Sequence, residues 1–163
     1  MVSKRDQRKT WGLAIIYLRN TLGGVEVLQA EPRRSGSKDA AFYAQGYYSG
    51  EHSEGPGSNQ DAEAFVCSDV RELIKTQRGI VEKRLQNAEH ESALWKATYP
   101  DYIQVDVFTN RGTCNRCAVV SQLLSDDIIR FFRPRDVSVK ALYMAESAMA
   151  PGRYFCSLLV ARV

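Results

Sequence analysis

The feature that most constrains this chain is an alternating segment followed by a turn and two closely spaced cysteines. Residues 102–109 (YIQVDVFT) alternate apolar and polar side chains, which predicts a β-strand. Residues 110–113 are typical of a turn, and a helix is predicted from Cys114 to about Phe132. The sequence therefore places Cys114 and Cys117 at the start of a helix, where the helix dipole favours the thiolate form of cysteine.

The remaining elements predict the fold class. Helical spacing of apolar residues predicts a long helical stretch from Asp61 to about Thr98, divided at Gly79, with a second helix over residues 80–97. Residues 32–38 and 49–60 are predicted loops. Further strands are predicted at residues 11–19, 25–30, 41–48, 137–144 and 154–163. This order indicates an α/β fold, with a mixed central β-sheet of about five strands flanked by helices.

Length and composition limit the class of protein. The chain has 163 residues, which predicts a single domain over residues 1–163, with residues 1–10 as a frayed basic N-terminus. Hydrophobic residues make up 44% and charged residues 25%, values that exclude a collagen and a wholly disordered chain. No apolar run approaches the length of a membrane span, and no secretory signal is visible. We therefore expect no membrane association.

The charge balance permits an anionic partner without requiring one. The formal net charge is +3, and the isoelectric point is about 8.7. Basic residues cluster in three places: Lys4, Arg5, Arg8 and Lys9; Arg33, Arg34 and Lys38; and Arg130, Arg133 and Arg135. Such clusters are typical of a solvated basic surface, and they are also compatible with nucleic-acid binding.

The four cysteines suggest metal binding at one place only. A chain of this length does not need disulfides, and Cys114 and Cys117 form the one close pair, with C-x-x-C spacing. This pair could bind a metal, act as a redox pair or be incidental. A redox pair is expected near the start of a βαβ unit, whereas this pair lies two-thirds of the way along the chain. Cys67 and Cys156 lie among apolar residues and are predicted core cysteines.

Two carboxylates lie at the predicted start of the earlier helix. Asp61 and Glu63 directly follow a glycine-rich loop, a position where acidic residues also serve simply as helix caps. A catalytic zinc takes three protein ligands and keeps one position for water. One carboxylate and two thiolates from two helix N-termini could provide those ligands, and a second carboxylate could take a proton from the water.

The segment VDVFTNRGTCNRCAVV and the D-x-E at residues 61–63 resemble the cytidine deaminase-like superfamily, and in particular deaminase domains of bacterial polymorphic toxins. The resemblance implies zinc (Zn²⁺) as cofactor, with Asp61, Cys114 and Cys117 as ligands and Glu63 as the catalytic proton shuttle. Two features depart from the family pattern. Thr113 stands where most members have proline, and Glu63 precedes Cys114 by 51 residues, a longer step than is usual.

The same resemblance implies the function and its setting. The expected reaction is hydrolytic deamination of a nucleobase, cytosine to uracil in DNA or RNA, by the toxic effector domain of a bacterial toxin. Nucleic acid is the expected substrate, and a cognate immunity protein is a further expected partner. The expected location is the cytoplasm of the producing or target cell, reached as part of a secreted toxin. Arg111 and Arg116 flank the first cysteine and would hold phosphates at the mouth of the site.

Other assignments of the carboxylate motif remain open. Asn87 and Glu89, with His90 beside them, lie at the commoner spacing of 25 residues before the cysteine pair, although asparagine is a poor zinc ligand and the motif falls inside the predicted helical run. His52 and Glu54 have the literal H-x-E form but lie in a predicted loop.

Two functions of other classes are also open. One is a non-catalytic zinc module that binds nucleic acid, with Cys67 or His90 as a fourth ligand. The other is an interaction domain without metal, in which the cysteine spacing is incidental. A zinc ion held by four protein ligands would favour the first, and absence of metal after gentle purification would favour the second.

Overall fold

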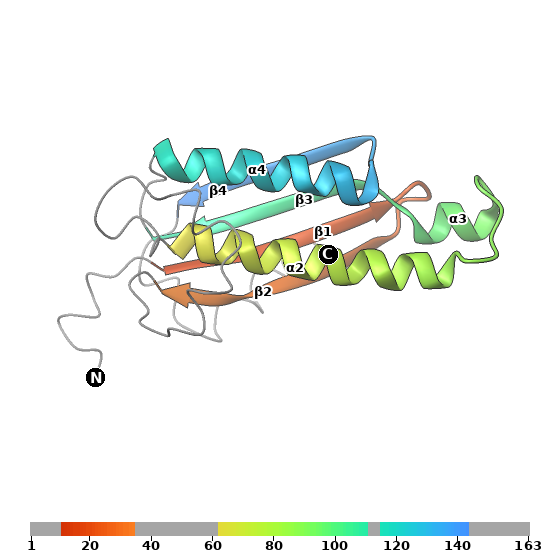
Figure 1. Ribbon diagram of the computed structural model, residues 1–163, viewed down its shortest axis with the longest axis horizontal. Coiled ribbons are helices and arrows are strands. Elements are labelled where there is room, and N and C mark those ends of the chain that lie inside the picture. The colour runs from red at the N-terminus through yellow and green to blue at the C-terminus, as the bar shows by residue number, and fades with distance from the viewer. Residues whose placement is uncertain (1–10, 35–61, 111–114, 144–163) are drawn as a thin grey trace.

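A computed structural model describes residues 11–34, 62–110 and 115–143 (Figure 1). Within these residues, four strands form one open sheet, and helices α2 and α4 cover one of its faces. The elements in chain order are β1 (Trp11–Asn20), β2 (Val25–Arg34), α2 (Ala62–Arg84), α3 (Ala93–Thr98), β3 (Pro100–Thr109), α4 (Asn115–Phe132) and β4 (Asp136–Tyr143).

The sheet is mixed, with strand order β2-β1-β3-β4. β1 pairs antiparallel with both β2 and β3, whereas β3 and β4 are parallel and are joined by the crossover helix α4. The β1–β2 turn is held by the Asn20 side chain, whose Oδ1 accepts hydrogen bonds from the backbone N–H groups of Leu22 (3.0 Å) and Gly24 (2.9 Å). Gly23 has φ +87°, a conformation that glycine adopts at little cost.

The predicted α/β class with a mixed sheet is confirmed, but the described sheet has four strands and not about five. The predicted strands at residues 41–48 and 154–163 lie outside the described residues. β2 is longer than predicted, because it continues through Pro32 into the region expected to be a loop. Proline lacks a backbone donor and is tolerated there because β2 is an edge strand of the described sheet.

Two apolar clusters lie on opposite faces of the sheet. The larger is formed between the sheet and helices α2 and α4, and its members include Ile16, Val70, Val105, Leu124 and Ile128, all with 0% exposed surface. The smaller, on the other face, consists of Leu13, Ile15, Tyr17 and Phe108, with Trp11 and Leu142 packed against it. Alternation along β1 and β3 produces this division, since successive side chains of a strand point to opposite faces.

The predicted break at Gly79 and the helix predicted over residues 80–97 are wrong. α2 runs unbroken through Gly79 to Arg84, because a single glycine costs only about 1 kcal/mol and Ile74 and Val81 are buried on either side of it. Residues 85–92 form turns, in which Glu91 has φ +66°. The six-residue helix α3 follows, and the N-cap Ser92 accepts a hydrogen bond from the backbone N–H of Trp95 at 3.2 Å.

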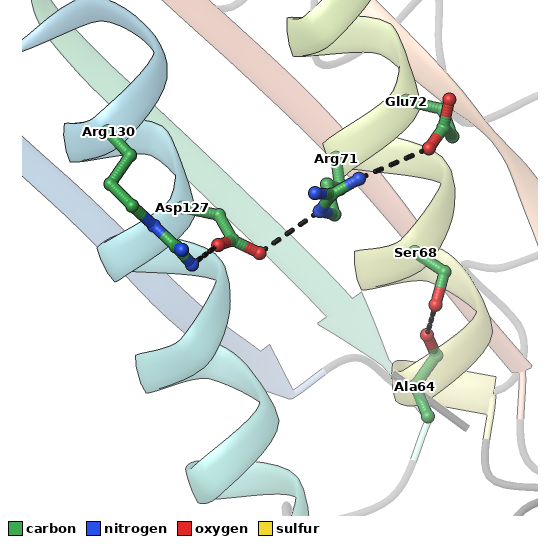
Figure 2. Close-up of polar contacts among 6 residues, drawn as sticks. All are labelled: Ala64, Ser68, Arg71, Glu72, Asp127 and Arg130. Carbon is green, nitrogen blue, oxygen red and sulfur yellow. Dashed lines mark hydrogen bonds and ion pairs between the residues drawn. The ribbon is translucent and has the colours of Figure 1, made fainter. Parts of the chain in front are cut away.

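A buried ion pair links the two helices that cover the sheet. In Figure 2, Arg71 of α2 and Asp127 of α4 point toward one another, with Arg71 Nε 3.1 Å from Asp127 Oδ2. Arg130, one turn further along α4, contacts the other carboxylate oxygen of Asp127. Asp127 is only 2% exposed, so the two guanidinium groups supply the positive charge that a buried carboxylate needs. None of the helices in the described ranges is long and apolar enough to span a membrane.

Candidate active site

The candidate active site is the end of the sheet where β3 and β4 terminate. Because β3 and β4 are parallel and α4 returns between them, the N-terminus of α4 lies at the carboxyl end of β3. Figure 1 shows that α2 also begins at this end, beside the start of α4. The topology therefore brings the starts of α2 and α4 to one end of the sheet, although they are more than fifty positions apart in the sequence.

Close contact between α2 and β1 fixes the start of α2. A side chain added at Gly12 would place its Cβ 3.2 Å from Val66 Cγ2 and 3.5 Å from the Ala62 Cβ, so the absence of a side chain at Gly12 allows α2 to approach β1. Gly12 pairs with Thr109, the last residue of β3. The first turn of α2, which carries Glu63, is therefore held next to the end of β3.

The end of β3 is held by a reciprocal pair of hydrogen bonds. The backbone N–H of Trp11 donates to Asn110 Oδ1 at 2.8 Å, and the backbone N–H of Asn110 donates to the carbonyl of Trp11 at 3.3 Å. Asn110 is 4% exposed and directly precedes residues 111–114. Sequence analysis assigned Asn110 only to a turn. Its role could be foreseen in part, because asparagine at a strand end often bonds to nearby backbone.

Glu63 is the predicted site residue that the structure describes most fully. It lies in the first turn of α2, where an acidic side chain interacts favourably with the helix dipole, and it is 7% exposed. A carboxylate shielded from water at a helix start can bind a proton from a substrate without competition from bulk solvent.

Cys67 follows Glu63 by one helical turn and is 1% exposed. Burial, and secondarily the negative charge of Glu63, raise the pKa of the Cys67 thiol to about 12. The thiol is therefore protonated at neutral pH, whereas a zinc ligand is a thiolate. This environment agrees with the prediction of a core cysteine.

The three predicted zinc ligands are described only in part. Asp61 and Cys114 lie outside the described residues, as do Arg111, His52, Glu54 and Cys156. The backbone of Cys117 lies in the first turn of α4, at the same end of the sheet as Glu63. In the described part of the chain, no three His, Cys, Asp or Glu side chains gather closely enough to hold a metal ion.

The donor types on the two helix starts nevertheless suit zinc, which binds thiolate and carboxylate ligands. In the sequence, Asp61 directly precedes α2 and Cys114 directly precedes α4, and both lie outside the described residues.

The alternative motif Asn87–Glu89 lies at the opposite end of the molecule. It follows the C-terminus of α2, a helix of 23 residues, and it is in turns rather than inside a helix as predicted. His90 beside it is exposed, and its ring centroid lies 4.7 Å from that of Trp95. His90 lies in a turn and not in the helix predicted over residues 80–97. The length of α2, about 34 Å at 1.5 Å per residue, separates Glu89 and His90 from the start of α4.

Comparison with known proteins gave no match: no family model fits the chain, and no curated protein or solved structure is significantly similar to it. The class that the described residues define is therefore an α/β protein with a mixed sheet, and its function has to be argued from the site itself.

Proposed function

We propose that this protein is a zinc-dependent deaminase that converts cytosine to uracil in DNA or RNA, with a cytidine deaminase-like fold, and that it is the toxic effector domain of a bacterial toxin. The observation that carries the proposal is the placement of Glu63. This buried carboxylate lies at the same end of the sheet as the first turn of α4, which bears Cys117. The resemblance of the D-x-E and C-x-x-C motifs supports the same assignment.

Each residue has a defined task in the proposed reaction. Asp61, Cys114 and Cys117 would hold zinc, which when bound lowers the pKa of a coordinated water toward 7. Glu63 accepts one proton from the attacking water and delivers it to the ring nitrogen, and it then carries the second proton, from the new hydroxyl at C4, to the departing amine. A C–O bond forms at C4 of cytosine and the C–N bond at C4 breaks, so that one water is consumed and one ammonia leaves.

The packing of the described backbone near Glu63 supports this chemistry. Glu63 is held by the contact of α2 with Gly12, and the end of β3 by the hydrogen bonds between Trp11 and Asn110. General acid–base catalysis requires that the proton carrier stay within hydrogen-bond reach of the substrate, and a carboxylate on a packed helix start meets this condition better than one on a loop.

The test is the zinc content of the purified protein, together with uracil formation on single-stranded and double-stranded oligonucleotides. We expect about one zinc per chain and ammonia release in step with uracil. Cys114→Ser should lose the metal. Full zinc occupancy in Cys114→Ser would remove this site from consideration, and a protein that holds zinc but converts no base would contradict the deaminase.

The polymer preference has its own test, in which turnover of cytidine, deoxycytidine and a short oligonucleotide is compared across a salt series. Unpaired bases should react faster, because unstacking a base from a duplex costs a few kcal/mol. Contacts from Arg111 and Arg116 to phosphates should make the apparent affinity fall with salt, by a log–log slope of about −0.7 per contact on single strands. Equal rates on nucleoside and oligonucleotide, without salt dependence, would indicate a small-molecule deaminase.

A further inference from the structure

The flank of α2 that faces α4 carries regularly spaced basic residues. Arg71 contacts Asp127 of α4, and Lys75 and Arg78 follow at helical spacings that place them on the same flank. From the other side come Arg130 of α4 and Arg133, which follows the end of that helix. We define the basic seam by these five residues: Arg71, Lys75, Arg78, Arg130 and Arg133.

The acidic residues near the basic seam neutralise it only in part. Asp127 is buried and contacts Arg71 and Arg130. Glu72 contacts Arg71 at 3.4 Å, and Glu82 contacts Arg78 at 2.8 Å. Both of these glutamates are 62% exposed, so their ion pairs are weak and can be exchanged for a stronger anion. Asp101, two residues after Tyr99, also lies near the far end of the seam, so the described seam has five basic groups against four acidic groups.

An aromatic stack lies at the far end of the basic seam. The Tyr99 ring meets the Phe132 ring edge-on, with centroids 5.9 Å apart, and Arg133 directly follows Phe132. Burial raises the pKa of Tyr99, whereas the positive charges of Arg133 and Arg78 lower it and the negative charges of Asp101 and Glu82 raise it further. Tyr99 stacks on Trp95, with ring centroids 5.0 Å apart and planes 12° apart. His90, whose side chain is 71% exposed, packs against the other ring of the stack, Trp95.

We propose that the basic seam and this aromatic stack bind single-stranded nucleic acid, along the part of the strand that leads away from the candidate active site. Single-stranded nucleic acid is bound through a positive surface that follows the phosphates, combined with aromatic rings on which bases stack, and this surface has both. Arg71 lies eight residues after Glu63, about 12 Å along α2 at 1.5 Å per residue. The inference rests on the nucleic-acid part of the proposed function.

Binding of a fluorescein-labelled single-stranded oligonucleotide, measured by anisotropy across a salt series, tests the proposal. Lys75→Gln, Arg78→Gln and Arg133→Gln should each weaken binding and reduce the log–log salt slope by about 0.7. Glu82→Gln should strengthen binding, because it removes a negative charge from the seam. His90→Ala should weaken binding about fivefold or more while the salt slope stays unchanged, because stacking releases no counterion.

The matched controls are Arg19→Gln and Lys140→Gln. Both residues are exposed and lie on the face of the sheet opposite α2 and α4. Each control variant loses one positive charge, as the seam variants do. Because these charges lie on the opposite face, both control variants should bind the oligonucleotide like the parent protein. Polyglutamate of matched charge is the control ligand, because it is an anion that has neither bases nor phosphates.

The outcomes separate this inference from the proposed function. If the seam variants bind the oligonucleotide like the parent while the parent still forms uracil in it, nucleic-acid binding by the seam is contradicted and the deaminase activity is supported. If the seam variants lose affinity and salt slope but the parent forms no uracil, nucleic-acid binding by the seam is supported and the deaminase activity is contradicted. If the parent protein does not bind the oligonucleotide, or binds polyglutamate equally well, the proposal that the seam binds single-stranded nucleic acid is contradicted.

Discussion

Glu63 is the residue on which the proposed chemistry depends most directly. Glu63→Gln keeps the shape of the side chain but cannot carry the proton, so turnover should fall by at least about 10²–10⁴-fold. Zinc content and thermal stability should stay close to those of the parent protein. Glu89→Ala is the control for the alternative motif and should retain activity. Loss of activity in Glu89→Ala, with activity intact in Glu63→Gln, would show that the motif at residues 87–89 is the functional one.

Cys67 gives a prediction about alkaline pH. Its folded-state pKa is raised to about 12, whereas in the unfolded chain it has an ordinary value of about 8.5. Between these values the folded protein keeps the thiol proton and the unfolded chain releases it. The stabilisation is therefore fully present below about pH 8.5, and the free energy of unfolding should fall as the pH rises above that value.

Urea unfolding at about pH 8 and about pH 10 measures this effect, with Cys67→Ala as the comparison. The variant lacks the thiol, so its free energy of unfolding should decrease less between the two pH values. An equal decrease in both proteins would mean that the Cys67 thiol titrates normally in the folded state.

At the scale of elements, the start of α2 depends on its contact with β1. Gly12→Ala would place a Cβ 3.2 Å from Val66 Cγ2, so the Val66 side chain, which is fully buried, must give by a few tenths of an ångström. We expect a destabilisation of about 1–3 kcal/mol and a lower turnover, because Val66 and Glu63 lie on the same start of α2. Gly79→Ala is the matched control, since no atom lies within 4 Å of its added Cβ. That change should stabilise the helix by about 0.4–1 kcal/mol. Urea unfolding compares the two, and equal effects would contradict the close contact at Gly12.

The ion pair between α2 and α4 gives a second prediction at this scale. Arg71→Met removes a guanidinium group that contacts the buried carboxylate of Asp127, so the protein should lose about 3 kcal/mol of stability. Arg130→Met removes a side chain that is 72% exposed and should cost much less. Combining Arg71→Met with Asp127→Leu should restore most of the loss, because no buried charge then lacks a partner. Additive losses in the double variant would show that the two residues act independently.

At the scale of the whole molecule, zinc would join two helices that are distant in sequence. Anything that binds only the folded state stabilises it, by about 2.7 kcal/mol when the free ligand is at 100 times its Kd. Removing zinc with a chelator should therefore lower Tm, and adding zinc back should restore it. In Cys114→Ser the chelator should have no effect. A Tm that does not change with the chelator in the parent would contradict a zinc ion bridging α2 and α4.

The strands and the α4 helix could be predicted from sequence because their patterns are local. Residues 103–107 alternate apolar and polar side chains within β3, and the predicted helix ending at Phe132 agrees with α4. The break at Gly79 could not be predicted correctly, because burial of Ile74 and Val81 against the sheet outweighs the local cost of one glycine. The inclusion of Pro32 in β2 likewise depends on the place of that strand at an edge of the described sheet.

The sequence by itself determined which residue types could form a site: a D-x-E at one helix start and a C-x-x-C at another, with chemistry that suits zinc. It did not determine which carboxylate motif lies near the cysteine pair, since spacing along the chain favoured Glu89 and helix-start chemistry favoured Glu63. The tertiary structure decided their positions. The parallel pairing of β3 with β4 requires α4 to begin at the carboxyl end of β3, and Gly12 admits the start of α2 at that same end. The long α2 carries Glu89 to the other end of the sheet, because distance in a fold is set by packing and helix length and not by the number of residues between two motifs.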